Sequence, residues 1–270
     1  MKKCFLLLFV VFFLNISCSK AKDYDGIITP KVEEPSWKIV FEDNFDGSSL
    51  SSVWSNCPRQ TSDWNKYIEN NAQTLEVSGG YLSLRAVVNP DKSAGAVPYL
   101  TSGIKTQGKV SVKYGKIEVR ARFLTGQGAW PAIWMMPEDQ SEGWPACGEI
   151  DIMERLNYET IVYQTVHSYY VDVLKLKEYP VYSKKVSFME NDFNTYGIEW
   201  YADKICFTLN GSVTFIYPKI VTDSKGQWPF DKAFYLILNQ AAGGSWAGNV
   251  NPSHLPFEMK VDWVKIYQMQ

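Results

Sequence analysis

Apolar and polar positions alternate with a period of two along most of the chain, in short stretches. Such alternation is typical of strands that bury one face. The alternating stretches are residues 37–41, 81–86, 115–123, 195–201, 205–209, 213–217 and 259–267. Turn sequences such as Asn210-Gly211 and Gly243-Gly244 separate them, and no long stretch has a convincing helical period. The pattern predicts an all-β fold, a sandwich or jelly roll of two antiparallel sheets.

Length and composition narrow the classes of protein. The 270 residues suit one large β domain, and no repeat or second domain interrupts the pattern. The formal net charge is −2 and there is no basic stripe, so nucleic acid is excluded as a partner. Aromatic residues make up 15% of the chain, more than a core requires, and this surplus fits sugar binding. We expect a monomer.

The N-terminus reads as a targeting segment. Lys2 and Lys3 precede an apolar run over residues 5–14, which is too short to span a bilayer. Ser17 before Cys18 resembles a bacterial lipoprotein processing site, at which the cysteine becomes lipidated; simple secretion is the alternative.

The domain boundaries follow from this segment. We expect a signal peptide over 1–17, the lipidated Cys18 with a polar tether over 18–36, and one folded domain over 37–270. The lipid would attach the protein to a membrane of a bacterial cell envelope, on the periplasmic side or at the outer surface.

Three cysteines remain for the folded domain: Cys57, Cys147 and Cys206. They allow at most one disulfide, and their spacing matches no metal motif. We interpret Cys147 as a thiol of the core or of a cleft wall rather than as a nucleophile.

Three carboxylates occur within six residues, at Glu149, Asp151 and Glu154, between apolar side chains. In a regular strand Glu149 and Asp151 share one face, and Glu154 lies on the opposite, apolar face. Burial of an unpaired carboxylate is costly. A β-bulge with one extra residue at Met153 returns Glu154 to the face of the other two, and bulges are frequent next to active sites. We therefore predict three acids on one wall of a cleft.

Crowded carboxylates cannot all ionise easily, so one keeps its proton near neutral pH. A protonated acid beside an ionised one is what glycoside hydrolysis requires. Two carboxyl groups roughly 5–5.5 Å apart retain the configuration of the sugar through a glycosyl-enzyme intermediate. Glu149 and Glu154 are the candidate pair, with Asp151 between them adjusting both.

Two other interpretations of these acids stay open from the residues alone. Ile150, Ile152, Met153 and Leu156 are compatible with the buried side of a short helix whose acids face water. The acids are also possible metal ligands.

Several blocks, in order along the chain, resemble glycoside hydrolase family 16. They are residues 128–137 (GAWPAIWMMP), 148–154 (GEIDIME), 196–200 (YGIEW), 234–246 (FYLILNQAAGGSW) and 261–267 (VDWVKIY). The resemblance implies a β-jelly roll with a concave, open cleft for polysaccharides. It also implies roles: Glu149 as nucleophile, Asp151 as helper acid and Glu154 as general acid/base.

The finer resemblance is to the laminarinase branch. The six-residue, bulged form of the acidic motif is typical of laminarinases, agarases and carrageenases. The blocks around Trp130 and Gln240 look most like laminarinases, which implies internal cleavage of β-1,3-glucan or mixed-linkage β-1,3/1,4-glucan without a catalytic cofactor. The family often has leucine where Gln240 stands, and residues 155–158 are not a standard continuation of the motif. An agarase- or carrageenase-like specificity is the alternative, and a glycan-binding lipoprotein without activity is the rival from another class.

Six residues are predicted to contact substrate. Trp130 and Trp134 share a strand face, and Trp246 lies in a glycine-rich loop, so their rings are candidates for stacking on sugars. The matching family position of His167 lies near the catalytic acids. Arg120 is a candidate for bonding sugar hydroxyls, although it and Arg122 could instead pair with Glu118; Gln240 completes the set.

Two further residues are less defined. Trp144 precedes the acidic motif and fits either a cleft or a solvent position, and His254 is expected in a surface loop.

Members of the family often hold one structural calcium ion on the convex side. The resemblance implies Glu42 or Asp43, a carbonyl near Gly80, and Asp262 as candidate ligands, and oxygen ligands suit calcium. The alternative is that these acids are ordinary surface charges.

Overall fold

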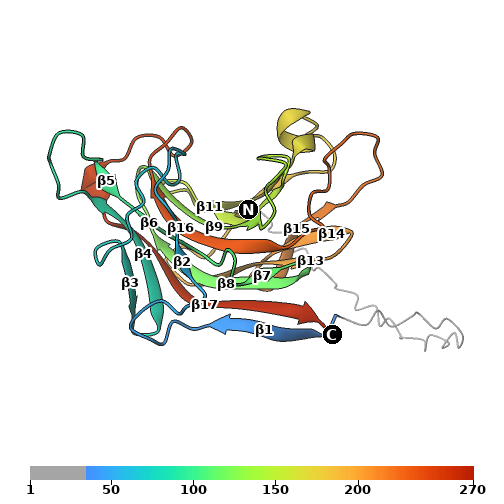
Figure 1. Ribbon diagram of the computed structural model, residues 1–270, viewed down its shortest axis with the longest axis horizontal. Coiled ribbons are helices and arrows are strands. Elements are labelled where there is room, and N and C mark those ends of the chain that lie inside the picture. Colours follow the sequence, from blue (N-terminus) through green and yellow to red (C-terminus); the bar gives the residue numbers. More distant parts are fainter. Residues whose placement is uncertain (1–34) are drawn as a thin grey trace, which may run out of the picture. The chain divides into compact units, whose positions relative to one another are not determined.

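The structure, a computed structural model, describes residues 35–270 and consists of two antiparallel sheets packed face to face (Figure 1). The predicted all-β jelly-roll sandwich is confirmed. The leader, Cys18 and nearly all of the predicted tether lie outside the described residues.

One sheet has nine strands. Their order is β15 (Ser212–Pro218), β14 (Lys204–Leu209), β13 (Asn194–Trp200), β8 (Gly115–Leu124), β17 (Phe257–Met269), β4 (Tyr81–Val88) and β3 (Leu75–Ser78), with β1 (Trp37–Asp43) on β17 and β5 (Tyr99–Leu100) on β4.

The other sheet has eight strands. Their order is β12 (Ser183–Ser187), β11 (Ile161–His167), β10 (Glu149–Glu154), β9 (Ala129–Pro137), β16 (Phe234–Ala242), β6 (Ser102–Lys105) and β2 (Ser55–Asn56), with β7 (Ser111–Val112) on β16. Two short helical turns complete the described elements, a π-helix η1 (Tyr169–Val173) and a 3₁₀ turn η2 (Pro252–His254).

The strands form where the alternation predicts them. All seven stretches become strands, and their ends differ from the predictions by no more than two residues. Asn210 and Gly211 both have positive φ angles, 50° and 79°, as a tight hairpin turn between β14 and β15 requires.

The core lies between the two sheets, because each sheet turns one set of alternate side chains inward. Ile133 and Met135 of β9 and Leu236 and Leu238 of β16 belong to this core. The alternate residues of the same strands, such as Trp134 of β9, belong to a second apolar cluster on the other face of the eight-stranded sheet. That face carries the candidate site.

A bulge is present in β10, one residue before its predicted position at Met153. Asp151 pairs with Trp134 of β9 and Met153 pairs with Ile133, so Ile152 is the additional residue. Ile152 and Met153 are both fully buried in the core. Two successive residues therefore point inward, and Glu154 returns to the face of Glu149 and Asp151. The helical interpretation of this segment is wrong, because every residue from 149 to 154 is part of a sheet.

The three described cysteines are buried free thiols and form no disulfide. Cys147 belongs to the second apolar cluster, as a core or cleft-wall thiol would. Within residues 35–270, no helix is both long and apolar enough to span a membrane.

Candidate active site

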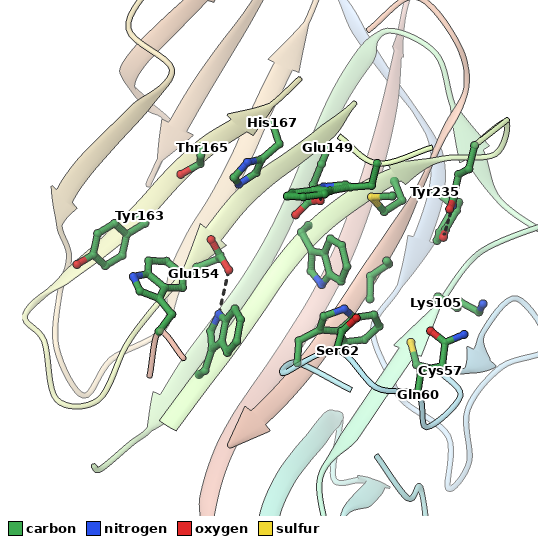
Figure 2. Close-up of a pocket in the computed structure, with 18 of the residues that line it drawn as sticks. Cys57, Gln60, Ser62, Lys105, Glu149, Glu154, Tyr163, Thr165, His167 and Tyr235 are labelled. Atoms are coloured by element: carbon green, nitrogen blue, oxygen red, sulfur yellow. Dashed lines mark hydrogen bonds between the residues drawn. The ribbon is translucent and has the colours of Figure 1, made fainter. Parts of the chain in front are cut away.

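An open cleft of about 1140 Å³ lies over the eight-stranded sheet (Figure 2). Its lining includes Glu149, Glu154, His167, five tryptophans (Trp64, Trp130, Trp134, Trp144 and Trp246), three tyrosines (Tyr163, Tyr182 and Tyr235) and two lysines (Lys105 and Lys185). The cleft is therefore aromatic, and the three-acid strand β10 crosses its centre.

Strand pairing places the acids against His167. Glu149 lies opposite His167 of β11, and Glu154 lies opposite Tyr163 of the same strand. One oxygen each of Glu149 and Asp151 and a ring nitrogen of His167 lie within 4.8 Å of one another. Figure 2 shows Glu149, Glu154 and His167 directed to the same side of adjacent strands.

Burial makes the charged forms of these acids costly. It raises the pKa of Glu149 to about 8; the charge of Asp151 adds to the rise, and His167 and a hydrogen bond from Trp144 oppose it. Burial and the charge of Glu154 raise the pKa of Asp151 to about 6, against the effect of His167. Such a cluster holds at least one proton near neutral pH.

A hydrogen bond from a tryptophan orients Glu154. Trp130 Nε1 donates a hydrogen bond of 2.9 Å to Glu154 Oε1, drawn as a dashed line in Figure 2. Burial raises the pKa of Glu154 to about 7, and this hydrogen bond opposes the rise. Glu154 therefore exchanges its proton within the neutral range, as a group that alternates between acid and base needs to do.

Trp144, which the sequence left undecided, lines the cleft. Its Nε1 donates a hydrogen bond of 2.5 Å to Glu149 Oε2, and its ring centroid lies 5.8 Å from that of His167. The indole remains 58% exposed, so a bound chain can still reach its face.

His167 lies between two carboxylates. Its Nε2 is 3.3 Å from Asp151 Oδ2, and its Nδ1 is 3.1 Å from Asp172 Oδ2. Burial lowers the pKa of His167, but the two aspartates outweigh that effect and raise it to about 12. The two aspartates therefore favour the protonated ring. Among the described residues, Glu149, Asp151 and His167 form the one group of histidine and acidic side chains that could hold a metal, and a histidine must be deprotonated at the nitrogen that binds one.

The tryptophans predicted to contact sugars all line the cleft. The Trp130 ring meets Trp246 edge to face with centroids 5.5 Å apart, and Trp246 also contacts Tyr163 at 5.1 Å. Trp246 is 43% exposed at the rim. Trp134 is more deeply buried in the floor, where its Nε1 donates to Asn239 Oδ1 at 2.7 Å.

Two of the substrate-contact predictions are wrong. Arg120 belongs to β8 of the nine-stranded sheet, where it pairs with Asp262 and stacks on Phe193, away from the cleft. Alternation identified its outward face correctly but not the sheet to which the strand belongs. Arg122 also stacks on Phe193, so the suggested pairing of both arginines with Glu118 is not formed.

Gln240 is fully buried, and its Nε2 donates to the Ala241 carbonyl. The alternation of β16 explains this placement. Tyr235 and Ile237 face the cleft, whereas Leu236, Leu238 and therefore Gln240 face the core. His254, as predicted, is exposed, in η2.

The candidate calcium ligands do not fit an ion as they are placed. Asp262 is paired with Arg120, and Glu42 Oε1 lies 3.0 Å from Lys265 Nζ. The oxygens of Asp43 accept hydrogen bonds from Phe45 N, Ser51 Oγ and Trp54 Nε1. These carboxylates bind protein donors instead of converging on one point.

Several cleft residues were missed by the sequence analysis. Tyr163 lies four residues before His167 in β11, on the same face of the strand, and could have been found from that spacing. Lys105, Lys185 and Asp172 carry no local signal, because the strands and the turn that hold them meet the acids only in the folded protein.

The fold and this site define a jelly-roll carbohydrate hydrolase with carboxylates at the centre of an open, aromatic cleft. Comparison with known proteins agrees, because residues 60–265 match the model of the family described as "Glycosyl hydrolases family 16". The chain belongs to this family of glycoside hydrolases.

Individual relatives are enzymes of several specificities. A keratan-sulfate endo-1,4-β-galactosidase of Sphingobacterium multivorum is 39% identical over 93% of this chain and 60% of its own length. A β-glucanase of Rhodothermus marinus is 34% identical over 87% of this chain and 86% of its own length. The X-ray structure of the laminarinase from Rhodothermus marinus superposes with a TM-score of 0.75 at 30% identity, over 88% of this chain and all of that one. The chain thus spans less than two thirds of the Sphingobacterium relative.

Proposed function

We propose that the protein is a retaining endo-β-glucanase that hydrolyses internal linkages of β-1,3-glucan or mixed-linkage β-1,3/1,4-glucan. The observation that carries the proposal is the bulge in β10, which puts Glu149, Asp151 and Glu154 on one face of the strand, with Glu149 and Glu154 lining the open cleft. Similarity to a β-glucanase and a laminarinase supports the glucan substrate.

The mechanism follows from the positions of Glu149 and Glu154, which both reach the bound sugar from β10. A carboxylate oxygen of Glu149 attacks the anomeric carbon and forms a glycosyl ester, while Glu154 gives its proton to the leaving glycosidic oxygen as that bond breaks. Glu154, now ionised, takes a proton from water, whose oxygen attacks the same carbon and releases Glu149. Each step leaves charge and protons balanced without a cofactor.

The surrounding groups adjust these steps. The Trp144 N–H stabilises the ionised form of Glu149, and the Trp130 N–H stabilises Glu154 after it has lost its proton. Burial and the charge of Asp151 favour the protonated form of Glu149, and the charge of His167 together with the Trp144 N–H increases the ionised fraction that can attack.

A substrate panel tests this proposal. Reducing-sugar release with sizing of products is measured on laminarin, barley mixed-linkage glucan, lichenan, agarose and κ-carrageenan, with Glu149→Ala as the inactive control. Internal cleavage of a glucan by the wild type alone supports the proposal. Glucan cleavage by the variant at the wild-type rate would contradict it, and binding without any cleavage would favour a glycan-capture protein.

A second candidate is an endo-β-galactosidase acting on a sulfated chain. Outside the catalytic group, the charged side chains that line the cleft are Lys105 and Lys185, and neither has a carboxylate partner among the described residues. Lys185 lies two strands from Glu154 by register, about 10 Å, and Lys105 three strands from Asp151, about 14 Å. Figure 2 shows Lys105 at the end of the cleft opposite Tyr163.

Two cations flanking the acids fit a chain that carries sulfate groups, and the Sphingobacterium relative points the same way. Keratan sulfate and its desulfated form, added to the panel, separate this candidate from the first. Lys185→Met and Lys105→Met should lower kcat/KM only on the sulfated chain, by about five- to tenfold each in low salt. Lys113→Met, outside the cleft, is the matched control.

We also propose that Cys18 anchors the protein in the bacterial cell envelope and that the folded domain is monomeric. The support is the leader sequence alone for the anchor. Cys18→Ser should move the protein from the membrane to the soluble fraction, and light scattering of the domain should give the mass of one chain.

A further inference from the structure

The second ring nitrogen of His167 has a partner that no part of the catalytic motif contains. Nδ1 lies 3.1 Å from Asp172 Oδ2, and the same oxygen accepts the Ser168 N–H at 3.1 Å. Asp172 belongs to η1, the yellow coil in Figure 1, which follows directly after β11. The side chain thus reaches back over one turn to the histidine at the end of the strand.

Packing holds this turn in place. A side chain at Gly226 would lie 2.6 Å from Tyr169 Cβ, so the turn sits tightly on the 226 loop. The Tyr170 N–H donates to the Gly226 carbonyl, and Tyr170 OH donates to the Tyr179 carbonyl. Ser168 Oγ accepts from Val171 N at the start of the turn. Asp172 is therefore positioned by contacts that do not involve the acids. A single-turn π-helix is uncommon and is often found at functional sites.

The charges around His167 come from several elements. Asp151, Glu149 and Glu154 face it from β10, Asp172 faces it from η1, and Lys177 acts on Asp172 from the following loop. Although burial opposes the change, the hydrogen bond with His167 lowers the pKa of Asp172, so this carboxylate is ionised. Both ring nitrogens of His167 meet ionisable oxygens, and a neutral imidazole can donate from only one nitrogen.

We propose that Asp172 is a positioning residue, which holds His167 with both nitrogens protonated so that an imidazolium stands beside Asp151 and Glu149. The positive charge lowers the cost of ionising a carboxylate in this buried cluster. Without Asp172, the cluster would retain a further proton at the same pH, and fewer molecules would carry an ionised Glu149.

The chain offers a direct measurement, because His167 and His254 are its two histidines. Nitrogen-15 NMR of the imidazole rings reports protonation and tautomer of each without any substrate. In the wild type, His167 should keep both nitrogens protonated above pH 8, while exposed His254 serves as internal reference. Asp172→Asn should lower the pKa of His167 by about two pH units or more and leave the His254 signals unchanged.

Two variants separate charge from local structure. Asp172→Glu keeps the charge and should retain the imidazolium. Ser168→Ala removes a cap of the same turn but keeps Asp172, and it should leave the His167 titration near that of the wild type. A neutral His167 at pH 8 in the wild type would overturn the proposal even if Asp172→Asn failed to fold. An unchanged titration in a folded Asp172→Asn would reduce Asp172 to a helix cap.

The kinetic consequence rests on the proposed hydrolase function, whereas the NMR result does not. On whichever glycan the wild type cleaves, Asp172→Asn should lower kcat about tenfold with little change in KM. It should also move the acidic limb of the pH profile up by about one unit, because the carboxylates ionise later. An NMR shift without activity on any glycan would contradict the proposed function and not the placement of His167.

Discussion

Carboxylates on the two sheets have opposite surroundings. On the nine-stranded sheet each acid in an ion pair faces a basic side chain: Asp262 faces Arg120, Glu42 faces Lys265 and Glu118 faces Lys116. On the cleft face of the eight-stranded sheet, three crowded acids, of which Asp151 is buried and the other two are partly buried, lie near one histidine. Carboxylates therefore form ion pairs on one sheet and retain protons near neutral pH on the other.

The difference shows what a site requires beyond the presence of acids. Partly exposed ion pairs such as that of Glu42 with Lys265 contribute little free energy, so Glu42 is replaceable. Crowded, buried acids destabilise the fold at neutral pH, and such an arrangement is expected where their chemistry is used. Four experiments, from the largest expected effect to the smallest, test this contrast.

Loss of Glu149 or Glu154, the proposed nucleophile and general acid/base, should have the largest effect on turnover. Glu149→Ala and Glu154→Ala are each expected to reduce turnover of polysaccharide roughly 10³-fold or more. With an aryl glycoside, whose leaving group needs no proton, Glu154→Ala should regain much of the first step, whereas Glu149→Ala should not. Burst kinetics on both substrates measure this. Equal loss for both variants on the aryl glycoside would remove the separate roles.

The proton that Glu154 retains near neutral pH should also affect how the free energy of unfolding depends on pH. Because the pKa of Glu154 is raised from 4.5 to about 7, the folded state binds more protons than the unfolded state in that window. Stability therefore falls as pH rises from about 4.5 to 7. Glu154→Gln removes this effect and should be more stable than the wild type at pH 8 by up to roughly 3 kcal/mol, with little difference at pH 4. Urea unfolding at the two pH values checks this. A constant difference would show that Glu154 is not a proton store.

The tryptophan donors should have an intermediate effect. Trp144→Phe keeps an aromatic ring but removes the N–H that Glu149 accepts. Loss of about 1 kcal/mol should raise the pKa of Glu149 and reduce kcat/KM roughly five- to tenfold below pH 7, less above it. Trp144→Tyr and Trp144→Ala distinguish the ring from its donor. A phenylalanine variant with the wild-type pH profile would assign Trp144 to stacking alone.

The smallest effect is expected on the outer sheet. Glu42→Gln breaks the pair with Lys265, which is partly exposed, and should change the free energy of unfolding by less than about 1 kcal/mol. Turnover should remain at the wild-type value. If Glu42→Gln changed turnover severalfold, the two sheets would be coupled and the contrast between them would fail.

Local pattern was enough to predict the strands and the central acids. Alternation identified β8, β13 and β17, and the conflict between apolar spacing and Glu154 predicted a bulge in β10. Both inferences depend on neighbours within a few residues, where the period of a strand leaves little choice. For the same reason the tryptophans of β9 were placed on one face correctly.

The sequence alone could not predict which residues of different strands contact one another. Arg120 was assigned to the cleft from a shared strand face and Gln240 from its place in a block that resembles laminarinases. Neither signal indicates whether a side chain meets the core, the cleft or the outer solvent. Strand order brings Lys105, from β6, and Lys185, from β12, to the same cleft. The chain by itself determined an all-β fold with three acids on a bulged strand. Only the tertiary structure decided which groups surround those acids, since Asp172 meets His167 through a turn whose position depends on packing against Gly226.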